Sequence, residues 1–363
     1  MTKLEFITNI HPSFKLNGLQ YTENELVVFA KDLEKSGVHY EIQIGIFLQQ
    51  WLDEKNWVLV KTSGSTGTPK EIQLSKEQMI NSAKATGIFF KLPENTTALL
   101  CLPSNYIAGK MMLVRAMVLG WDLHIVAPEK DAITQYDNKY DFVAMVPYQV
   151  HHSIKSLNKI KKLIIGGGTI SEELNNQLQK VETEVFATYG MTETITHIAV
   201  RRINGLAKST SYTALPDVKF SLDGRNCLVI DAPNVTDEKV ITNDMVQLNS
   251  STNFEYLGRV DNVINSGGIK LFPEQIEAKL SPFIKEPFII ASESDDKLGE
   301  RLILILENAS NESNEISSNI SEVFQHLSTY ERPKKIYTFS KFPFTETGKI
   351  KRKEVLQILK SNK

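Results

Sequence analysis

The chain has 363 residues, of which 41% are hydrophobic and 23% are charged. This length predicts two or three domains, and this composition is typical of a soluble globular protein. The 41 basic and 43 acidic side chains leave a formal net charge of -2, which disfavours a protein that wraps nucleic acid, because that function needs a basic excess.

The two cysteines carry information about the compartment. Cys101 and Cys227 lie far apart and have no metal-binding partners at useful spacing. This disfavours a disulfide scaffold and a zinc site, and it favours a reducing compartment. The N-terminus lacks the apolar stretch and cleavage site of a signal peptide, and no later segment is apolar for long enough to span a membrane. We therefore expect a cytoplasmic protein without a membrane span, and the sequence leaves a homo-oligomer open.

The first two thirds of the chain combine helical and strand patterns. Apolar spacing predicts helices at 24–37, 41–52 and 76–92. Short apolar runs then alternate with amphipathic segments. The runs are TALLCLP, DLHIVAP, FVAMVP, KKLIIGGG and VFATYG, and the helices between them are expected near 107–119, 148–157 and 171–180. This alternation predicts a layered α/β domain with largely parallel strands.

The character of the sequence changes near residue 212. Short strands and turn signals there predict a small β-rich subdomain. A second break falls near Asp261, beyond which strands and helices predict a small α+β domain. We therefore expect an N-terminal domain over 1–260 and a C-terminal domain over 261–363. The segment 307–319 is rich in Asn, Ser and Glu and is expected to be a solvated loop.

A loop of small residues follows the strand expected at 58–60. Its sequence is KTSGSTGTPK, residues 61–70. Backbone N–H groups in such a glycine-rich turn point into one concavity, and the hydroxyl groups add donors, so the loop suits phosphate oxygens. It fails the P-loop pattern, because Pro69 stands where glycine is required and Glu71 where serine or threonine would hold magnesium. The alternative is a surface linker.

Four later motifs are ambiguous when taken singly. LIIGGGTI permits the close approach of a planar group, but it is equally a packing turn. ATYGMTETITH brings an aromatic ring, a threonine and a carboxylate to a strand end, which suits a purine, a phosphate and its magnesium, although helix capping explains the last two residues as well. Residues 242–277 contain carboxylates and an arginine that suit ribose hydroxyls or form a surface ion pair. The lysine in FPFTETGKIKRKEV is, on its own, merely solvated.

In their order, these motifs resemble those of the adenylate-forming superfamily of acyl-CoA synthetases, adenylation domains and luciferases. TSGSTGTPK, GGG, YGMTE, GRVDNVINSGGIKLFPEQIE and PFTETGKIKR follow the family's order between residues 62 and 352. The resemblance implies an ATP-dependent acid–thiol ligase. A carboxylate would attack the α-phosphorus of ATP and displace pyrophosphate. A thiol, expected to be that of coenzyme A, would then take the acyl group. The resemblance also implies Mg²⁺ and a C-terminal domain that rotates between the two steps.

The resemblance implies roles for individual residues. Lys349 matches the catalytic lysine, Glu193 matches the Mg²⁺ ligand, and Thr192 matches the contact to the α-phosphate. The implied ATP-binding residues are Thr62, Ser63, Gly64, Ser65, Thr66, Gly67 and Lys70 at the phosphates, Gly166, Gly167, Gly168 and Tyr189 at the adenine, and Asp244 and Arg259 at the ribose.

The chain departs from the family pattern at two places. Asn243 replaces the glycine of the family's TGD triplet, just before the ribose-binding aspartate. Family members are also usually longer, and most of the missing length lies before the phosphate loop, so we expect a trimmed N-terminal subdomain. Asp261 matches the hinge of the moving domain. The residues expected to face the site during thiol transfer are Ser266, Gly267, Gly268 and Lys270.

The acid substrate must be read from the segment CLPSNYIAGKMMLVRAMVLGW, which resembles that of o-succinylbenzoate–CoA ligases of menaquinone synthesis. Tyr106 stands at the usual histidine position. The second carboxylate of o-succinylbenzoate would benefit from a cation, for which Lys110 and Arg115 are candidates. They lie about 140° apart around a helix and cannot both face one pocket squarely, so we expect at least one of them to be solvated or to snorkel. Family geometry adds Thr194, Thr196 and His197 near the site.

Three functions remain open from the sequence. The first is an acyl-CoA ligase for o-succinylbenzoate. The second is adenylation of another aryl or fatty acid, or acyl loading of a carrier protein. The third is a degenerate nucleotide-binding protein without catalysis, which the intact Lys349, Glu193 and Arg259 disfavour.

Overall fold

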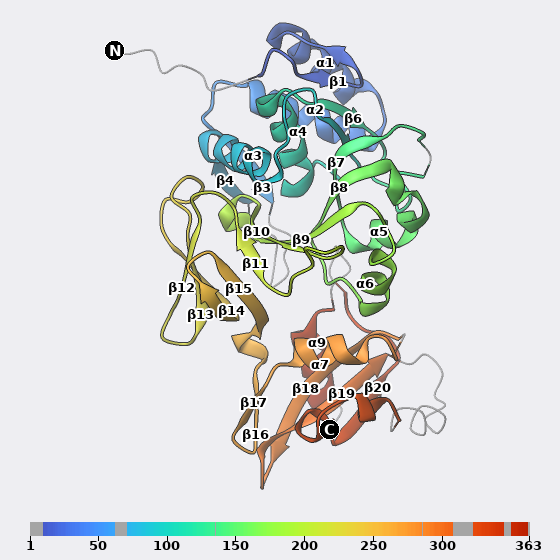
Figure 1. Cartoon of the computed structure of the whole chain (residues 1–363), viewed down its shortest axis with the longest axis vertical. Coiled ribbons are helices and arrows are strands. Elements are labelled where there is room, and N and C mark those ends of the chain that lie inside the picture. The colour runs from blue at the N-terminus through green and yellow to red at the C-terminus, as the bar shows by residue number, and fades with distance from the viewer. Residues whose placement is uncertain are drawn as a thin grey trace.

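The computed structural model describes residues 10–61, 71–134, 136–284, 286–307, 322–344 and 350–361. The described part forms a large body built on one long sheet and a small body with a sheet of its own, which lies below it in Figure 1. Within the described ranges, no helix has the length and apolar character needed to cross a bilayer.

The large body is organised around a 13-stranded sheet with the order β12-β13-β14-β15-β11-β10-β9-β8-β7-β5-β6-β1-β2. Strands β1, β6, β5, β7, β8 and β9 pair with one another in parallel, whereas β2 and β10 pair antiparallel with β1 and β9 at the two ends of this group. The strands of this half are β1 (Lys15–Leu16), β2 (Leu19–Gln20), β5 (Thr97–Leu100), β6 (Asp122–Ile125), β7 (Tyr140–Met145), β8 (Ile160–Ile165) and β9 (Glu184–Gly190).

Helices cover both faces of the parallel half. Adjacent strand residues point to opposite faces, so Leu100 and Ile164 pack in the core with α3 and α4, while Leu99 and Leu163 pack in the core with α5 and α6. This two-faced burial explains the continuous apolar runs of the sequence, and the predicted α/β fold class is confirmed. The helices are α1 (Glu23–Lys35), α2 (His39–Leu52), α3 (Lys76–Phe90), α4 (Ile107–Leu119), α5 (Pro147–Ser153), α6 (Glu172–Leu178) and the 3-10 helix η1 (Ile154–Lys159).

The segment that follows residue 196 is β-rich and antiparallel. It continues the long sheet, because β11 pairs with both β10 and β15. Its aromatic core includes Tyr212 stacked on Phe254, with ring centroids 5.4 Å apart. The strands are β10 (His197–Arg202), β11 (Tyr212–Ala214), β12 (Lys219–Leu222), β13 (Cys227–Asp231), β14 (Val240–Ser250) and β15 (Asn253–Arg259).

The small body follows the 3-10 turn η3 (Val260–Asn262). Its five-stranded sheet has the order β17-β16-β19-β18, and β20 pairs with β19. Helices α7 and α9 lie on the side nearer the large body, whereas β16 and β17 lie at the far end (Figure 1). The elements are β16 (Ile264–Ser266), β17 (Ile269–Leu271), α7 (Pro273–Leu280), β18 (Phe288–Asp295), β19 (Gly299–Glu307), η4 (Phe324–His326), η5 (Thr329–Glu331), β20 (Lys335–Phe339) and α9 (Arg352–Ser361).

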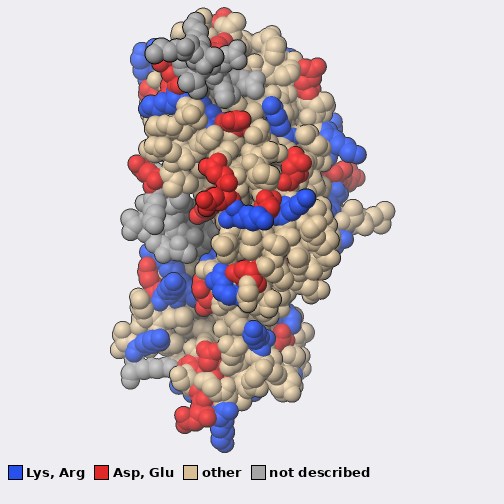
Figure 2. All heavy atoms as spheres, turned by 90° about the vertical axis from the view of Figure 1, so that its left-hand side faces the viewer, with Lys and Arg blue, Asp and Glu red and all other residues tan. Residues whose placement is uncertain are grey.

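Charge is distributed evenly over the face drawn in Figure 2. Basic and acidic side chains of the described residues are interspersed there and do not gather into a stripe of one sign. This distribution agrees with the small formal net charge of the chain, -2.

Candidate active site

The candidate site lies where the parallel strands end, at one edge of the sheet. Strand β8 runs into Gly166, Gly167 and Gly168, and β9 ends at Gly190. A Cβ atom on Gly166 would lie only 2.6 Å from the Thr188 hydroxyl oxygen, and Gly167 has a φ of +77°. These two positions need glycine, the first for close strand approach and the second for the left-handed backbone, so Gly166 and Gly167 have a structural role beside the predicted adenine contact.

Three predicted nucleotide-binding residues form one hydrogen-bonded cluster. The Tyr189 hydroxyl donates to Asp244 Oδ2 at 2.5 Å, and Arg259 Nη1 donates to Asp244 Oδ1 at 3.1 Å. Asp244 and Arg259 are opposite each other in the pairing of β14 with β15. Burial, and then the negative charge of Asp244, raise the pKa of Tyr189. The tyrosine is therefore a fixed donor that ties the end of β9 to β14.

A strained turn follows β9. Thr192–Thr194 forms the 3-10 turn η2, and Ile195 then has φ +64° and ψ -60°. Thr196 N donates to Thr194 O at 2.7 Å, which closes a γ-turn around Ile195. Such a conformation is rare for a β-branched residue and is typical of functional sites. The Thr194 hydroxyl donates to Thr196 O at 2.9 Å and therefore supports the turn itself.

Glu193 is an exposed carboxylate within this turn. Among the described residues, no hydrogen bond or ion pair engages its side chain. Mg²⁺ is usually bound by one or two carboxylates together with substrate phosphates. The described ranges contain no group of three or more potential metal-binding side chains.

A buried guanidinium lies beside this turn, in a group that we call the Arg115 cluster: Thr86, Arg115, Thr196 and His197. Arg115 is 1% exposed, and its nitrogens lie 3.3 Å from Thr86 Oγ1, 3.4 Å from Thr196 Oγ1 and 3.4 Å from His197 Nδ1. Within the described ranges it has no acidic partner. Burial, and then the charge of Arg115, lower the pKa of His197 well below its usual value, so His197 is neutral and Arg115 carries the only formal charge of the cluster.

The structure separates Lys110 from the Arg115 cluster. Lys110 is 6% exposed, and its ammonium lies 4.7 Å from the ring centroid of Phe47 on α2. The expectation that at least one of Lys110 and Arg115 is solvated or snorkels is wrong, because α4 is buried on nearly all sides. The contacts of the two side chains agree with the expectation that they face different directions. Tyr106 is half-buried at the N-cap of α4.

Lys110→Met is expected to stabilise the protein at neutral pH. Burial lowers the pKa of Lys110 from 10.5 to about 8, so the unfolded chain binds this proton more tightly than the folded protein does. Folding is therefore penalised below about pH 8, and the penalty fades as the pH rises toward 10.5. The variant should have a free energy of unfolding about 1–3 kcal/mol higher at pH 7, and a smaller advantage near pH 10. Urea unfolding at both pH values checks this, and a variant less stable than wild type at pH 7 would contradict it.

Two groups of predicted residues lie outside the described residues. They are Thr62, Ser63, Gly64, Ser65, Thr66, Gly67 and Lys70 of the phosphate loop, and Lys349. The strands on either side of the first group, β3 (Trp57–Lys61) and β4 (Glu71–Ser75), are antiparallel and pair Lys61 with Glu71. On either side of Lys349, Phe344 and Ile350 form an isolated antiparallel bridge.

A bidentate ion pair anchors the chain just after Lys349. Arg352 Nη2 donates to both oxygens of Glu277, at 2.6 and 2.8 Å, and Glu277 Oε1 also accepts from the Ile290 amide at 2.6 Å. The start of α9 is thereby fixed to α7 and β18. Sequence reasoning assigned no role to Glu277, although it is the last residue of the motif GRVDNVINSGGIKLFPEQIE, and it missed Thr86, a polar residue on α3 outside every motif.

The predicted hinge residue Asp261 lies in η3, between the two bodies. Its carboxylate contacts Arg259 Nη2 at 3.6 Å and Asn243 Nδ2 at 3.3 Å. The residues expected to face the site during thiol transfer lie on β16, β17 and their connecting turn, where Gly267, Gly268 and Lys270 are exposed. That hairpin lies at the end of the small body farthest from the large body (Figure 1).

A cavity of about 210 Å³ adjoins the Arg115 cluster. His197 and Ser82 contribute to its wall, and Ser82 O accepts a hydrogen bond from Thr86 Oγ1 at 3.0 Å. The rest of the lining is largely apolar and comes from α3 and from the connections around residues 215–218 and 232–235.

Comparison with known proteins gives concordant matches. The family described as "AMP-binding enzyme" matches residues 27–236. Proteins named 2-succinylbenzoate–CoA ligase include that of Staphylococcus epidermidis, 25% identical over 81% of this chain and 68% of the relative, and that of Lactococcus lactis, 26% identical over 84% and 71%.

Solved structures show the same architecture. One described as an acyl-CoA synthetase (AMP-forming)/AMP-acid ligase II-like protein from Dyadobacter fermentans is 36% identical, has a TM-score of 0.61, and aligns over 92% of this chain and 98% of that chain. The o-succinylbenzoate CoA synthetase of Bacillus subtilis, in complex with its acyl-adenylate intermediate, has a TM-score of 0.72 at 17% identity over 95% of each chain.

Glycines, a tyrosine–carboxylate pair and an exposed carboxylate gather at the carboxyl edge of the parallel strands, which is where ligands bind in open α/β sheets. The family match extends over more than half of the sequence, and the chain belongs to the AMP-binding enzyme family. This membership confirms the predicted class, an AMP-forming acid–thiol ligase.

Proposed function

We propose that the protein is an o-succinylbenzoate–CoA ligase of menaquinone biosynthesis. It would adenylate o-succinylbenzoate with ATP, release pyrophosphate, and transfer the acyl group to CoA. The names of the curated relatives support this substrate. The same proposal puts the reaction in the cytoplasm, where ATP and CoA are at hand, and the free, buried state of Cys101 and Cys227 is compatible with a reducing compartment.

The choice of o-succinylbenzoate as the acid is based on the buried charge of Arg115. A guanidinium that is 1% exposed and has no acidic partner in the described ranges is costly to bury. An anionic ligand group would offset that cost by a charge-assisted hydrogen bond. o-Succinylbenzoate has one carboxylate to activate and a second one to anchor, so a dicarboxylate substrate accounts for both the site and the unpaired cation.

The arrangement of the other residues supports the adenylation step. Tyr189 would contact the adenine, while Asp244 and Arg259 would hold the ribose. An oxygen of the substrate carboxylate would form a bond to the α-phosphorus as the bond to the pyrophosphate oxygen breaks. Glu193 would hold Mg²⁺, which when bound would supply neutralisation of the charge on the phosphates. Lys349 would stabilise the negative charge that develops between carboxylate and phosphate.

The second step would consume the acyl adenylate. The thiol of CoA would release its proton to solvent, and its sulfur would attack the acyl carbon as the bond between that carbon and the AMP oxygen breaks and AMP leaves. A mixed anhydride of this kind hydrolyses readily, so the site must exclude water until CoA arrives. The γ-turn at Ile195 and the buried Thr194 would form part of the wall that does this.

A pyrophosphate-release assay over a panel of acids tests the proposal. The panel contains o-succinylbenzoate, benzoate, a medium-chain fatty acid and a long-chain fatty acid, each with ATP, Mg²⁺ and CoA. We expect turnover that is highest with o-succinylbenzoate and a CoA thioester as product. Activity only with other acids would point to a different acyl-CoA ligase, adenylation without thioester formation would point to a carrier-protein thiol, and no turnover with any acid would contradict the enzyme function.

A further inference from the structure

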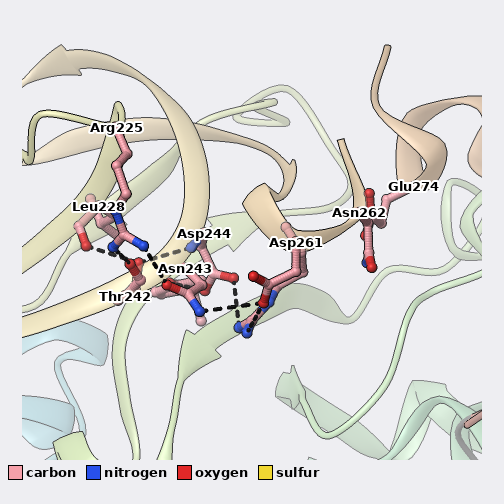
Figure 3. Close-up of polar contacts among 10 residues, drawn as sticks. Arg225, Leu228, Thr242, Asn243, Asp244, Asp261, Asn262 and Glu274 are labelled. Atoms are coloured by element: carbon pink, nitrogen blue, oxygen red, sulfur yellow. Dashed lines mark hydrogen bonds and ion pairs between the residues drawn. The ribbon is translucent and has the colours of Figure 1, made fainter. Parts of the chain in front are cut away.

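The hinge carboxylate is held by a chain of polar contacts that begins in the large body. Figure 3 shows Arg225, Asn243 and Asp261 in sequence, from the β12–β13 connection through β14 to η3. Arg225 Nη1 donates to Asn243 Oδ1 at 2.9 Å, and Asn243 Nδ2 donates to Asp261 Oδ2 at 3.3 Å. We call these three residues the hinge cluster.

Arg225 fixes the orientation of the Asn243 amide. A guanidinium has only donors, so it must meet the oxygen of the amide and leaves the NH₂ group pointing the other way. Arg225 is itself held, because its Nε donates to Asp223 Oδ2 at 2.8 Å and its Nη2 donates to Thr242 O at 3.0 Å. Asn243 is thus pre-oriented as a donor toward Asp261. A glycine at position 243, as in the family's triplet, could not make this contact.

The hinge cluster restrains an orientation that is unsuitable for thiol transfer. The β16–β17 hairpin, which carries the residues expected at the site during transfer, lies at the far end of the small body (Figure 1). If this hairpin faces the site during transfer, as the resemblance implies, then transfer requires rotation about Asp261. Rotation that moves this carboxylate breaks its contact with Asn243, whose amide is tied to the large body by Arg225.

We propose that Arg225 and Asn243 are positioning residues that hold the Asp261 hinge in the orientation seen here and slow its rotation toward thiol transfer. The inference rests on the proposed two-step function. An exposed hydrogen bond to a carboxylate has a modest strength, so its removal should change the rate of rotation by about two- to five-fold.

The test measures the two half-reactions separately by rapid quench, with o-succinylbenzoate as the acid. Asn243→Ala should speed thioester formation from the bound adenylate about two- to five-fold, while pyrophosphate release changes less than two-fold. Arg225→Met, which leaves the amide free to turn, should give an intermediate effect. A general loss of stability would slow both half-reactions and would not speed either one.

Asn249→Ala is the matched control. Asn249 lies on the same strand, and its Nδ2 donates to Ser211 Oγ at 2.9 Å, away from the hinge. The control should match wild type in both half-reactions. Trypsin cleavage within residues 259–270 gives a second readout of hinge mobility, and it should be faster in Asn243→Ala than in Asn249→Ala.

Two outcomes separate this inference from the proposed function. If the wild-type enzyme forms the adenylate and the thioester, but Asn243→Ala matches Asn249→Ala in the ratio of the two rates and in cleavage, the hinge inference is wrong and the function stands. If wild type forms no adenylate, the proposed function fails, and equal cleavage of the two variants would then overturn the hinge restraint as well.

Discussion

Replacement of Lys349 by alanine is expected to nearly abolish adenylate formation, whereas acyl transfer from a supplied adenylate continues. The ammonium group would bridge the attacking carboxylate and the α-phosphate, where negative charge gathers in the transition state. Removal of a group with this role typically lowers the rate by about 10²–10³-fold. The resemblance implies that transfer uses a different face of the C-terminal domain, so we expect that Lys349 is not needed there.

The two half-reactions can be measured independently. Adenylation is followed as pyrophosphate release from ATP and o-succinylbenzoate, and transfer is followed as thioester formation from synthetic o-succinylbenzoyl adenylate and CoA. Lys351→Ala is the matched control, because Lys351 is a neighbouring lysine whose described partner is Glu354, at 2.9 Å. Equal loss of both half-reactions in Lys349→Ala, or an equal effect in Lys351→Ala, would contradict the role of Lys349.

Replacement of Arg115 by methionine is expected to remove the preference for a dicarboxylate acid. Methionine fills much of the same space but has no charge, so the second carboxylate of o-succinylbenzoate would be buried without a partner. The loss of one partner of a buried charge pair costs about 2–5 kcal/mol, and kcat/KM for o-succinylbenzoate should therefore fall by about 10²-fold or more. Turnover of benzoate, which lacks the second carboxylate, should not fall.

Lys110→Met serves as the control for this experiment. Both positions are buried cations on α4, but Lys110 contacts Phe47 and lies outside the Arg115 cluster. The Lys110 variant should keep the substrate preference of wild type. Arg115→Lys should recover part of the preference, because an ammonium keeps the charge but not the planar fork of donors. An equal loss of kcat/KM with o-succinylbenzoate and benzoate in Arg115→Met would show that Arg115 has a structural role. An equal loss of substrate preference in Lys110→Met would show that Lys110 binds the second carboxylate instead.

Much of the large body could be predicted from periodicity. The apolar runs that became β5, β7, β8 and β9 are continuous because both faces of a parallel sheet are covered by helices. Their shared carboxyl edge follows from that topology, and it brings Gly166–168 and Tyr189 together. The contact between Asp244 and Tyr189 is harder to predict from the sequence, because it depends on how the antiparallel half joins the same sheet through β10 and β11.

The buried cations Lys110 and Arg115 show what helical periodicity cannot predict. Helical spacing correctly indicates that Lys110 and Arg115 face different directions. It cannot show that both are buried, because their exposure depends on α2, α3 and the β9–β10 turn, which pack around α4 from distant parts of the chain. The neutral state of His197 has the same origin, since it follows from burial next to Arg115.

The hinge cluster could not be inferred from spacing either. Arg225 and Asn243 meet because β13 and β14 pair side by side, and Asp261 reaches them because β15 returns along β14. Register of this kind is set by the packing of the whole sheet. The sequence indicates only that Asn243 stands where a glycine is usual in the family, and the contacts show which partners its side chain has.

The most direct test of the account is the product formed by the wild-type enzyme from o-succinylbenzoate, ATP, Mg²⁺ and CoA. Mass spectrometry of a quenched reaction should detect o-succinylbenzoyl-CoA, with AMP and pyrophosphate formed in equal amounts. Omission of CoA should leave an enzyme-bound acyl adenylate and a single turnover of pyrophosphate. Absence of both the adenylate and the thioester, under conditions where the folded protein is shown to bind ATP, would contradict the account.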